Sequence, residues 1–376
     1  MLYSRQMQSP ITSPVPSPRT ATIPTTTPTN GQAISLPDGL APYRLVGDAE
    51  ADAFLAKALL LPQELYPALQ AGGQSLIDFV QAQHPSLWAA VCSLPASGLS
   101  IQSKNTAKST ARQAKRIFHA HKGDFMLLLG LYSLPYCYAA AAGSRVLELT
   151  QRLHTSSYKR LSETGRFVFD IMEDDDAIGT PAILQVRIIH ALVRYHVGQH
   201  PDWDSAKHGL PVNQEDMAGT NLAFGYIACR GFRRMGGFLS PADQEAYLSY
   251  WRIVGHRLGV LPELLPATMG DSAALDAAIA QRQFAPSAAG ATLTQALLGA
   301  FTESEAPAFI KEKAPMLMAY FLGPELATML GLDFEGQAPD WLRLGKQLEG
   351  ALGLSLTFLP AGQLDREARR HQISYK

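Results

Sequence analysis

The segment 180–198 (TPAILQVRIIHALVRYHVG) carries three strongly polar side chains inside an otherwise apolar stretch. Arg187, His190 and Arg194 are separated by three and then four residues, so on a helix they project from one stripe. A neutral imidazole is a common metal ligand, and guanidinium groups bind carboxylates in a planar, two-pronged geometry. The stripe therefore combines the side chains that hold a metal with those that hold anionic groups.

The helix that carries this stripe is predicted to be buried, because apolar residues occupy nearly all of its faces. Two buried guanidinium groups need counter-charges, since uncompensated burial of a charge costs several kcal/mol. Protein carboxylates are one source. In that case His190 is a hydrogen-bonded core residue and the arginines pair with the acidic run at 173–176. A dianionic cofactor is the other source, and haem fits, with His190 on the iron and Arg187 and Arg194 reaching the propionates.

A second predicted helix, 157–172, precedes the first and has its own mixed face. Arg160, Thr164, Phe167 and Ile171 recur at spacings of four, three and four residues, so they share one side. Arg160 and Thr164 could hydrogen-bond a ligand bound between the two helices. The alternative is an ordinary surface turn in which Lys159 and Glu163 form a salt bridge.

The elements that must position these residues are predicted to be helices throughout. Residues 1–36 are rich in Pro, Thr and Ser and are expected to form a disordered tail, followed by one all-helical domain over 37–360 and a C-terminal tail over 361–376. Strict apolar–polar alternation is scarce, so little sheet is expected. The predicted helices span 50–61, 63–71, 74–83, 108–121, 125–142, 144–154, 157–173, 181–197, 214–236, 241–258, 272–283, 289–301, 306–330 and 338–351.

Composition excludes several classes of protein. The chain has 376 residues and a formal net charge of −1. It therefore lacks the basic surplus that proteins binding nucleic acid normally carry. Its three cysteines are far apart, which argues against a disulfide framework or a zinc cluster. The first residues lack a secretory signal, and we expect a cytoplasmic protein. The most apolar stretch, 125–143, contains Pro and Tyr and is expected to be a buried helix rather than a membrane span.

Taken in order, several segments resemble the MpaB-type and latex-clearing-protein-like family of haem oxygenases. RIIHALVR resembles the family's axial-histidine helix, with Arg187, His190 and Arg194 at matching positions. RLSETGRFV resembles the distal helix, with Arg160 and Thr164 matching. The resemblance covers roughly residues 105–350 and includes the segments 131–143, 209–226 and 246–260.

This resemblance implies an all-helical oxidoreductase with a b-type haem and His190 as the axial iron ligand. Arg160 and Thr164 would line the oxygen side, and Glu163 or Glu148 would act as the base that removes an allylic proton. The partners implied are dioxygen and an isoprenoid or other hydrophobic alkene.

The sequence departs from the family pattern near the expected catalytic groups. Some members carry a lysine beside the distal threonine, where this chain has Glu163. The family's catalytic acid falls at or near Ser144, and Glu148, one turn later, is a possible substitute. The haem site therefore transfers better than the alkene-cleaving groups.

Other functions remain open on the sequence. A helical protein that only binds or senses haem would use the same His190 and arginines. The acidic run 173–176 with Asp170 resembles a magnesium–diphosphate motif of a prenyl-diphosphate enzyme, although a solvated helix end is the simpler interpretation. His256 is a second-choice ligand, and Cys229 is an alternative thiolate ligand.

Overall fold

The computed structural model describes residues 38–95, 104–150, 157–173, 180–304 and 308–333. Over these ranges the chain is helical, and the only β-type pairing is an isolated bridge between Ala140 and Phe284. This confirms the predicted all-helical fold class. In chain order the elements are η1 (Asp38–Leu45), α2 (Ala49–Ala58), α3 (Pro62–Ala71), α4 (Gly73–Gln83), α5 (Pro85–Cys92), α6 (Lys104–Ala120), α7 (Lys122–Leu128), η2 (Leu129–Ser133), α8 (Leu134–Tyr138), α9 (Ala141–Leu149), α10 (Ser157–Glu173), α11 (Thr180–Gly198), α12 (Ser205–His208), α13 (Gln214–Leu222), η3 (Ala223–Ile227), α14 (Ala228–Arg234), α15 (Pro241–Arg257), η4 (Pro262–Leu264), α16 (Met269–Gln283), α17 (Ala288–Glu303), α18 (Ala308–Leu322) and α19 (Pro324–Met329).

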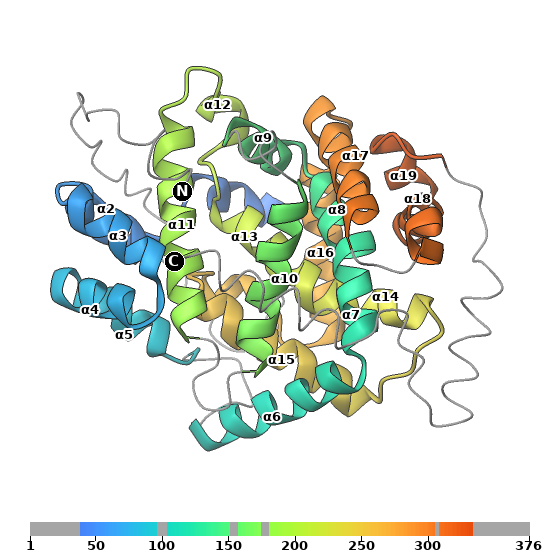
Figure 1. The fold of residues 1–376 in the computed structure, drawn as a ribbon, viewed down its shortest axis with the longest axis horizontal. Coiled ribbons are helices and arrows are strands. Elements are labelled where there is room, and N and C mark those ends of the chain that lie inside the picture. The colour runs from blue at the N-terminus through green and yellow to red at the C-terminus, as the bar shows by residue number, and fades with distance from the viewer. Residues whose placement is uncertain (1–37, 96–103, 151–156, 174–179, 305–307, 334–376) are drawn as a thin grey trace.

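Helix α11 lies between an N-terminal group of helices and the rest of the bundle (Figure 1). The N-terminal layer, defined here as α2–α5, covers one side of α11, and α10 packs on another. Helix α10 in turn packs against α17, while α6 lies at the lower edge of the view in Figure 1 and packs along α15. The helix predicted to carry the polar stripe is therefore enclosed by segments distant from it in sequence.

Large aromatic side chains form the core beside α10. Phe125 stacks against Phe232 and Tyr247, with ring centroids 5.7 and 4.8 Å apart. Tyr250 is fully buried and its hydroxyl donates to the carbonyl of Ile171, near the end of α10. Each such ring buries a large apolar area, so this packing supplies a rigid support for α10 and α15.

Two π-helical turns interrupt the predicted helices 125–142 and 214–236. The first, η2, joins α7 to α8, and the second, η3, joins α13 to α14. Pro135 lies just after η2, and the wider turn accommodates a residue that lacks an N–H and whose ring clashes with the carbonyl four residues earlier. The two turns pack together, and the Ser133 hydroxyl donates to the Ala223 carbonyl at 2.7 Å.

Most predicted helix boundaries agree with the structure to within a few residues. The predicted helix 306–330 is divided into α18 and α19, because Gly323 adopts a positive φ of 84° and Pro324 begins a new helix. Helix α5 was not predicted, and the predicted helix 338–351 lies outside the described residues.

The apolar stretch that begins at Phe125 packs inside the bundle, as predicted. Leu128, Leu131 and Tyr132 are all fully buried against neighbouring helices. Among the helices that the structure describes, none combines the length and apolarity needed to cross a membrane.

The bond between the two π-turns gives a test of the fold. Ser133→Ala removes a buried donor to the Ala223 carbonyl and is expected to lower the free energy of unfolding by about 1–3 kcal/mol. Thr302→Ala removes a side-chain-to-carbonyl hydrogen bond of the same kind at the exposed end of α17, and is expected to change it by less than about 0.5 kcal/mol. Urea unfolding followed by circular dichroism measures both. Equal effects would show that η2 and η3 are not coupled through this bond.

Candidate functional site

Helix α11 is held in place by apolar burial along most of its length. Ile183, Leu184, Ile188 and Leu192 are fully buried. Each such side chain contributes about 1.5–3 kcal/mol when it is removed from water. The prediction that this helix is buried is therefore confirmed.

Arg187 forms a two-pronged ion pair with Asp48, which begins the N-terminal layer. Its Nε donates to Oδ2 at 2.5 Å and its Nη2 donates to Oδ1 at 2.8 Å. Its Nη1 donates to the carbonyl of Arg257 at 3.1 Å, at the end of α15. Both members of the pair are buried, with side-chain exposures of 5% and 4%. One arginine thus connects three segments that are far apart in the sequence.

Arg194 forms the second ion pair, with Asp52 in α2. Its Nε donates to the two carboxylate oxygens at 2.9 and 3.0 Å, and its Nη1 donates to the Val212 carbonyl at 2.6 Å. Burial raises the pKa of Asp52, although Arg194 opposes this shift. The second pair therefore lies partly out of water, at the other end of the polar stripe.

The counter-charges of both arginines are thus protein carboxylates. The sequence hypothesis that they come from the acidic run 173–176 is wrong, because Asp48 pairs with Arg187 and Asp52 pairs with Arg194. Glu173, the first residue of that run, pairs with Lys122 at 3.0 Å, and residues 174–176 lie outside the described part of the chain. Arg187 directs one N–H of each of its three nitrogens at Asp48 and Arg257, so its charge is already paired with a protein carboxylate and not with the predicted propionate.

Two glycines leave room for these ion pairs. A Cβ at Gly47 would lie 2.7 Å from both Arg194 Nε and Asp52 Oδ2. A Cβ at Gly259 would lie 2.2 Å from Asp48 Oδ2, and Gly259 also adopts a positive φ of 91°. The backbone around each pair is therefore compatible with glycine and with little else.

His190 lies between the two arginines and differs from them in having no partner among the described residues. Its ring is half-buried, and its Nδ1 is buried without a hydrogen bond. Burial, and then the charge of Arg194, lower the pKa of His190 to about 4, against an opposing effect of Asp48. The imidazole is therefore neutral at pH 7 and keeps a lone pair, which is the form that binds a metal. A half-buried imidazole whose Nδ1 has no hydrogen bond fits an axial ligand of a haem iron.

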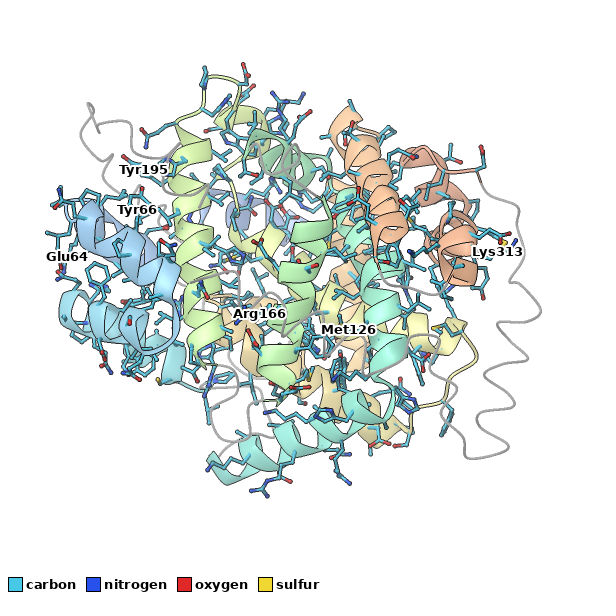
Figure 2. All side chains as sticks on the ribbon, viewed as in Figure 1. Glu64, Tyr66, Met126, Arg166, Tyr195 and Lys313 are labelled. Atoms are coloured by element: carbon cyan, nitrogen blue, oxygen red, sulfur yellow. The ribbon has the colours of Figure 1, made fainter. Side chains whose placement is uncertain are left out.

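Helix α10, which carries the second predicted set of residues, packs against α11. Glu163 and Thr164 are half-buried, while Arg160 lies in the first turn of α10 with its side chain outside the described set. Met126 from α7 approaches the same helix, and a Cβ at Gly165 would lie 3.1 Å from its Cε. In Figure 2, Met126 and Arg166 lie close to each other beside α10. The Met126 thioether thus lies near the part of α10 that carries Glu163, Thr164 and Arg166.

The remaining predicted catalytic residue, Glu148, is on α9, which also contacts α11. It is half-buried and forms an ion pair with Arg145. Ser144 is buried, and its hydroxyl donates to the Tyr138 carbonyl at 2.8 Å. Ser144 therefore has a structural partner of its own, and the nearest carboxylate on α9 is that of Glu148.

The second-choice ligands have different surroundings. His256 Nε2 lies 2.9 Å from the Ser93 hydroxyl, so this ring already has a hydrogen-bond partner. Burial raises the pKa of the Cys229 thiol to about 12, which disfavours a thiolate ligand. Among the described residues, no three His, Cys, Asp or Glu side chains gather as a metal site would require. A single axial histidine does not depend on such a cluster.

Comparison with known proteins places these helices in a family. The model of the catalytic domain of ER-bound oxygenase mpaB/B'/rubber oxygenase matches residues 117–352, which is more than half of the chain. The chain belongs to this family. A rubber oxygenase from Streptomyces sp. (strain K30) is 30% identical over 179 residues, which cover 46% of this chain and 44% of that protein. The match thus spans less than half of the relative.

A solved structure supports the fold of this oxygenase-family member over most of its length. The structure of latex clearing protein in its closed state superposes with a TM-score of 0.62 and covers 88% of this chain and 91% of that one. The sequence identity is 23%, so the likeness establishes a shared fold. The family match begins at residue 117, and Asp48 and Asp52 therefore lie before it.

The glycine beside Asp48 gives a prediction about the stability of this site. Gly259→Ala combines a positive φ with a collision against the ion pair, whereas Gly73→Ala has a φ of 49° and nothing within 4 Å. Gly73→Ala is expected to cost about 1–2 kcal/mol of unfolding free energy, and Gly259→Ala about 1–3 kcal/mol more. Denaturant titration of the two variants measures the difference. Equal costs would mean that the space beside Asp48 is not constrained.

Proposed function

We propose that the protein is a haem-dependent oxygenase that acts on a hydrophobic, isoprenoid-type alkene, with His190 as the axial iron ligand. The observation that carries this proposal is the half-buried, neutral His190, whose buried Nδ1 has no hydrogen bond, on a helix that packs against α10. Membership of the family and the name of the Streptomyces relative support the oxygenase activity. The resemblance of the segment around His190 to the family's axial-histidine helix supports haem.

The chain's own residues suit this chemistry in separate ways. The low pKa of His190 keeps the imidazole unprotonated and available to iron at neutral pH. Thr164 and Arg160, on α10, would orient a substrate or oxygen by hydrogen bonding. When bound, haem would supply the activation of dioxygen. Leu147 on α9, Leu161 on α10 and Ile189 on α11 are only partly buried, and such apolar side chains would favour a hydrophobic substrate over a charged one.

The proposed net reaction joins one alkene and one dioxygen to give two carbonyl fragments. It balances in atoms and electrons, so no external reductant is required. A carboxylate would assist by accepting an allylic proton and returning it later. Glu163 lies beside Thr164 on α10 and is the first candidate, and Glu148 on α9, which forms an ion pair with Arg145, is the second.

Haem binding is tested first. The purified protein titrated with haem is expected to develop a Soret band, and His190→Ala is expected to abolish it or shift it strongly. His256→Ala is the matched control, because this histidine has Ser93 as its partner, and it is expected to leave the band unchanged. If haem does not bind to the parent protein, or binds equally to His190→Ala, the proposal fails.

The catalytic base is tested by activity. Oxygen consumption with a polyisoprenoid substrate is expected to fall about 100-fold or more in Glu163→Gln, with the haem spectrum retained. Glu148→Gln is expected to keep most of the activity, since it loses only the pairing with Arg145. The opposite order of the two variants would assign the base to Glu148. No consumption by the haem-loaded parent with any alkene would favour a protein that only binds haem.

A further inference from the structure

The two ion pairs of α11 join the helix that carries His190 to the start of the N-terminal layer. Asp48 and Asp52 are separated by one helical turn in and before α2, and Arg187 and Arg194 flank His190 at three and four residues. Their pairing fixes α11 against α2 on both sides of the histidine. A rotation or a sliding of α11 would break both pairs together.

Each arginine also binds a backbone carbonyl in a third segment. Arg187 donates to Arg257 at the end of α15, and Arg194 donates to Val212 just before α13. Gln214 connects the same segments, because its Nε2 donates to the carbonyls of Gly47 at 2.9 Å and Gly259 at 2.8 Å. The depth and rotation of α11 are therefore set by a polar network rather than by apolar packing alone.

The two ion pairs also fit closely against the backbone around them. Gly47 and Gly259 are the residues against which the two pairs pack, and both carbonyls of these glycines are held by Gln214. Charged pairs that are buried contribute little net stability compared with apolar side chains of the same volume. What they do provide is a defined geometry, since a two-pronged guanidinium–carboxylate contact is strongly directional.

We propose that Asp48 and Asp52 are positioning residues for the axial histidine. Through Arg187 and Arg194 they hold α11 so that the His190 imidazole presents its nitrogen in one direction. The inference rests on the proposed function, and it places part of the haem-binding determinants in a segment that precedes the family match at residue 117. The two arginines of the stripe would thus serve the site by binding carboxylates of the chain itself.

The test uses the full chain and measures haem affinity by Soret titration. Asp48→Asn is expected to weaken haem binding by about tenfold or more, which is the usual effect of losing a residue that orients a metal ligand. The absorption spectrum of this variant with reduced haem is expected to differ from that of the parent, because the histidine is less well oriented. Asp78→Asn is the matched control: it makes the same substitution in the same layer, at an exposed residue whose partner is Gln74. It is expected to leave affinity and spectrum unchanged.

A second variant separates positioning from folding. Asp48→Asn alone leaves the Arg187 charge buried, so it could lower stability for that reason alone. Asp48→Asn combined with Arg187→Gln removes both charges and is expected to restore the unfolding midpoint of the haem-free protein toward the parent value. Haem affinity is expected to remain about tenfold weaker in this double variant.

The haem titration of the parent and the double variant has three distinguishable outcomes. A double variant that folds like the parent but binds haem weakly, with an altered spectrum, supports the inference. A double variant with parental affinity and spectrum overturns it, because the pair is then structural only. Failure of the parent itself to bind haem is a different result, which defeats the proposed function and, with it, this inference.

Discussion

The pairing of Arg187 with Asp48 is the interaction on which the rest of the site depends. Burying a guanidinium group to 5% exposure in a helical core costs much free energy unless a carboxylate lies beside it. The chain supplies that carboxylate from the residue that also caps α2, where Asp48 Oδ1 accepts the Ala51 N–H at 3.3 Å. One side chain therefore begins a helix and neutralises another, and this ties the N-terminal layer to α11 before any ligand is considered.

From this constraint the properties of His190 follow. Both arginines pair with acids of the chain, whereas the His190 ring has no hydrogen bond to the described residues. Burial then holds it neutral, with its pKa lowered to about 4. A neutral imidazole at a fixed position is a suitable iron ligand, and α10, which carries Glu163 and Thr164, packs against the same helix.

Much of this could be predicted from the sequence. The apolar pattern of 181–197, with Pro181 at its start and Gly198 at its end, predicted a buried helix, and α11 spans Thr180–Gly198. The polar stripe followed from spacing alone. The identities of the counter-ions could not be predicted, because Asp48 is 139 residues from Arg187 and its local role as a helix cap already accounts for its presence. The π-turns also leave no periodic signal, although Pro135 marks the place where an α-helix would be strained.

The central claim is that His190 binds iron while Arg187 stays on Asp48. An experimental structure of the haem-loaded protein tests both parts in one measurement. The expected result is a bond from a His190 ring nitrogen to the iron, with the two-pronged Arg187–Asp48 contact intact and the Arg194–Asp52 pair in place. An iron held by any other side chain, or an Arg187 that has left Asp48 to bind a propionate, would contradict it.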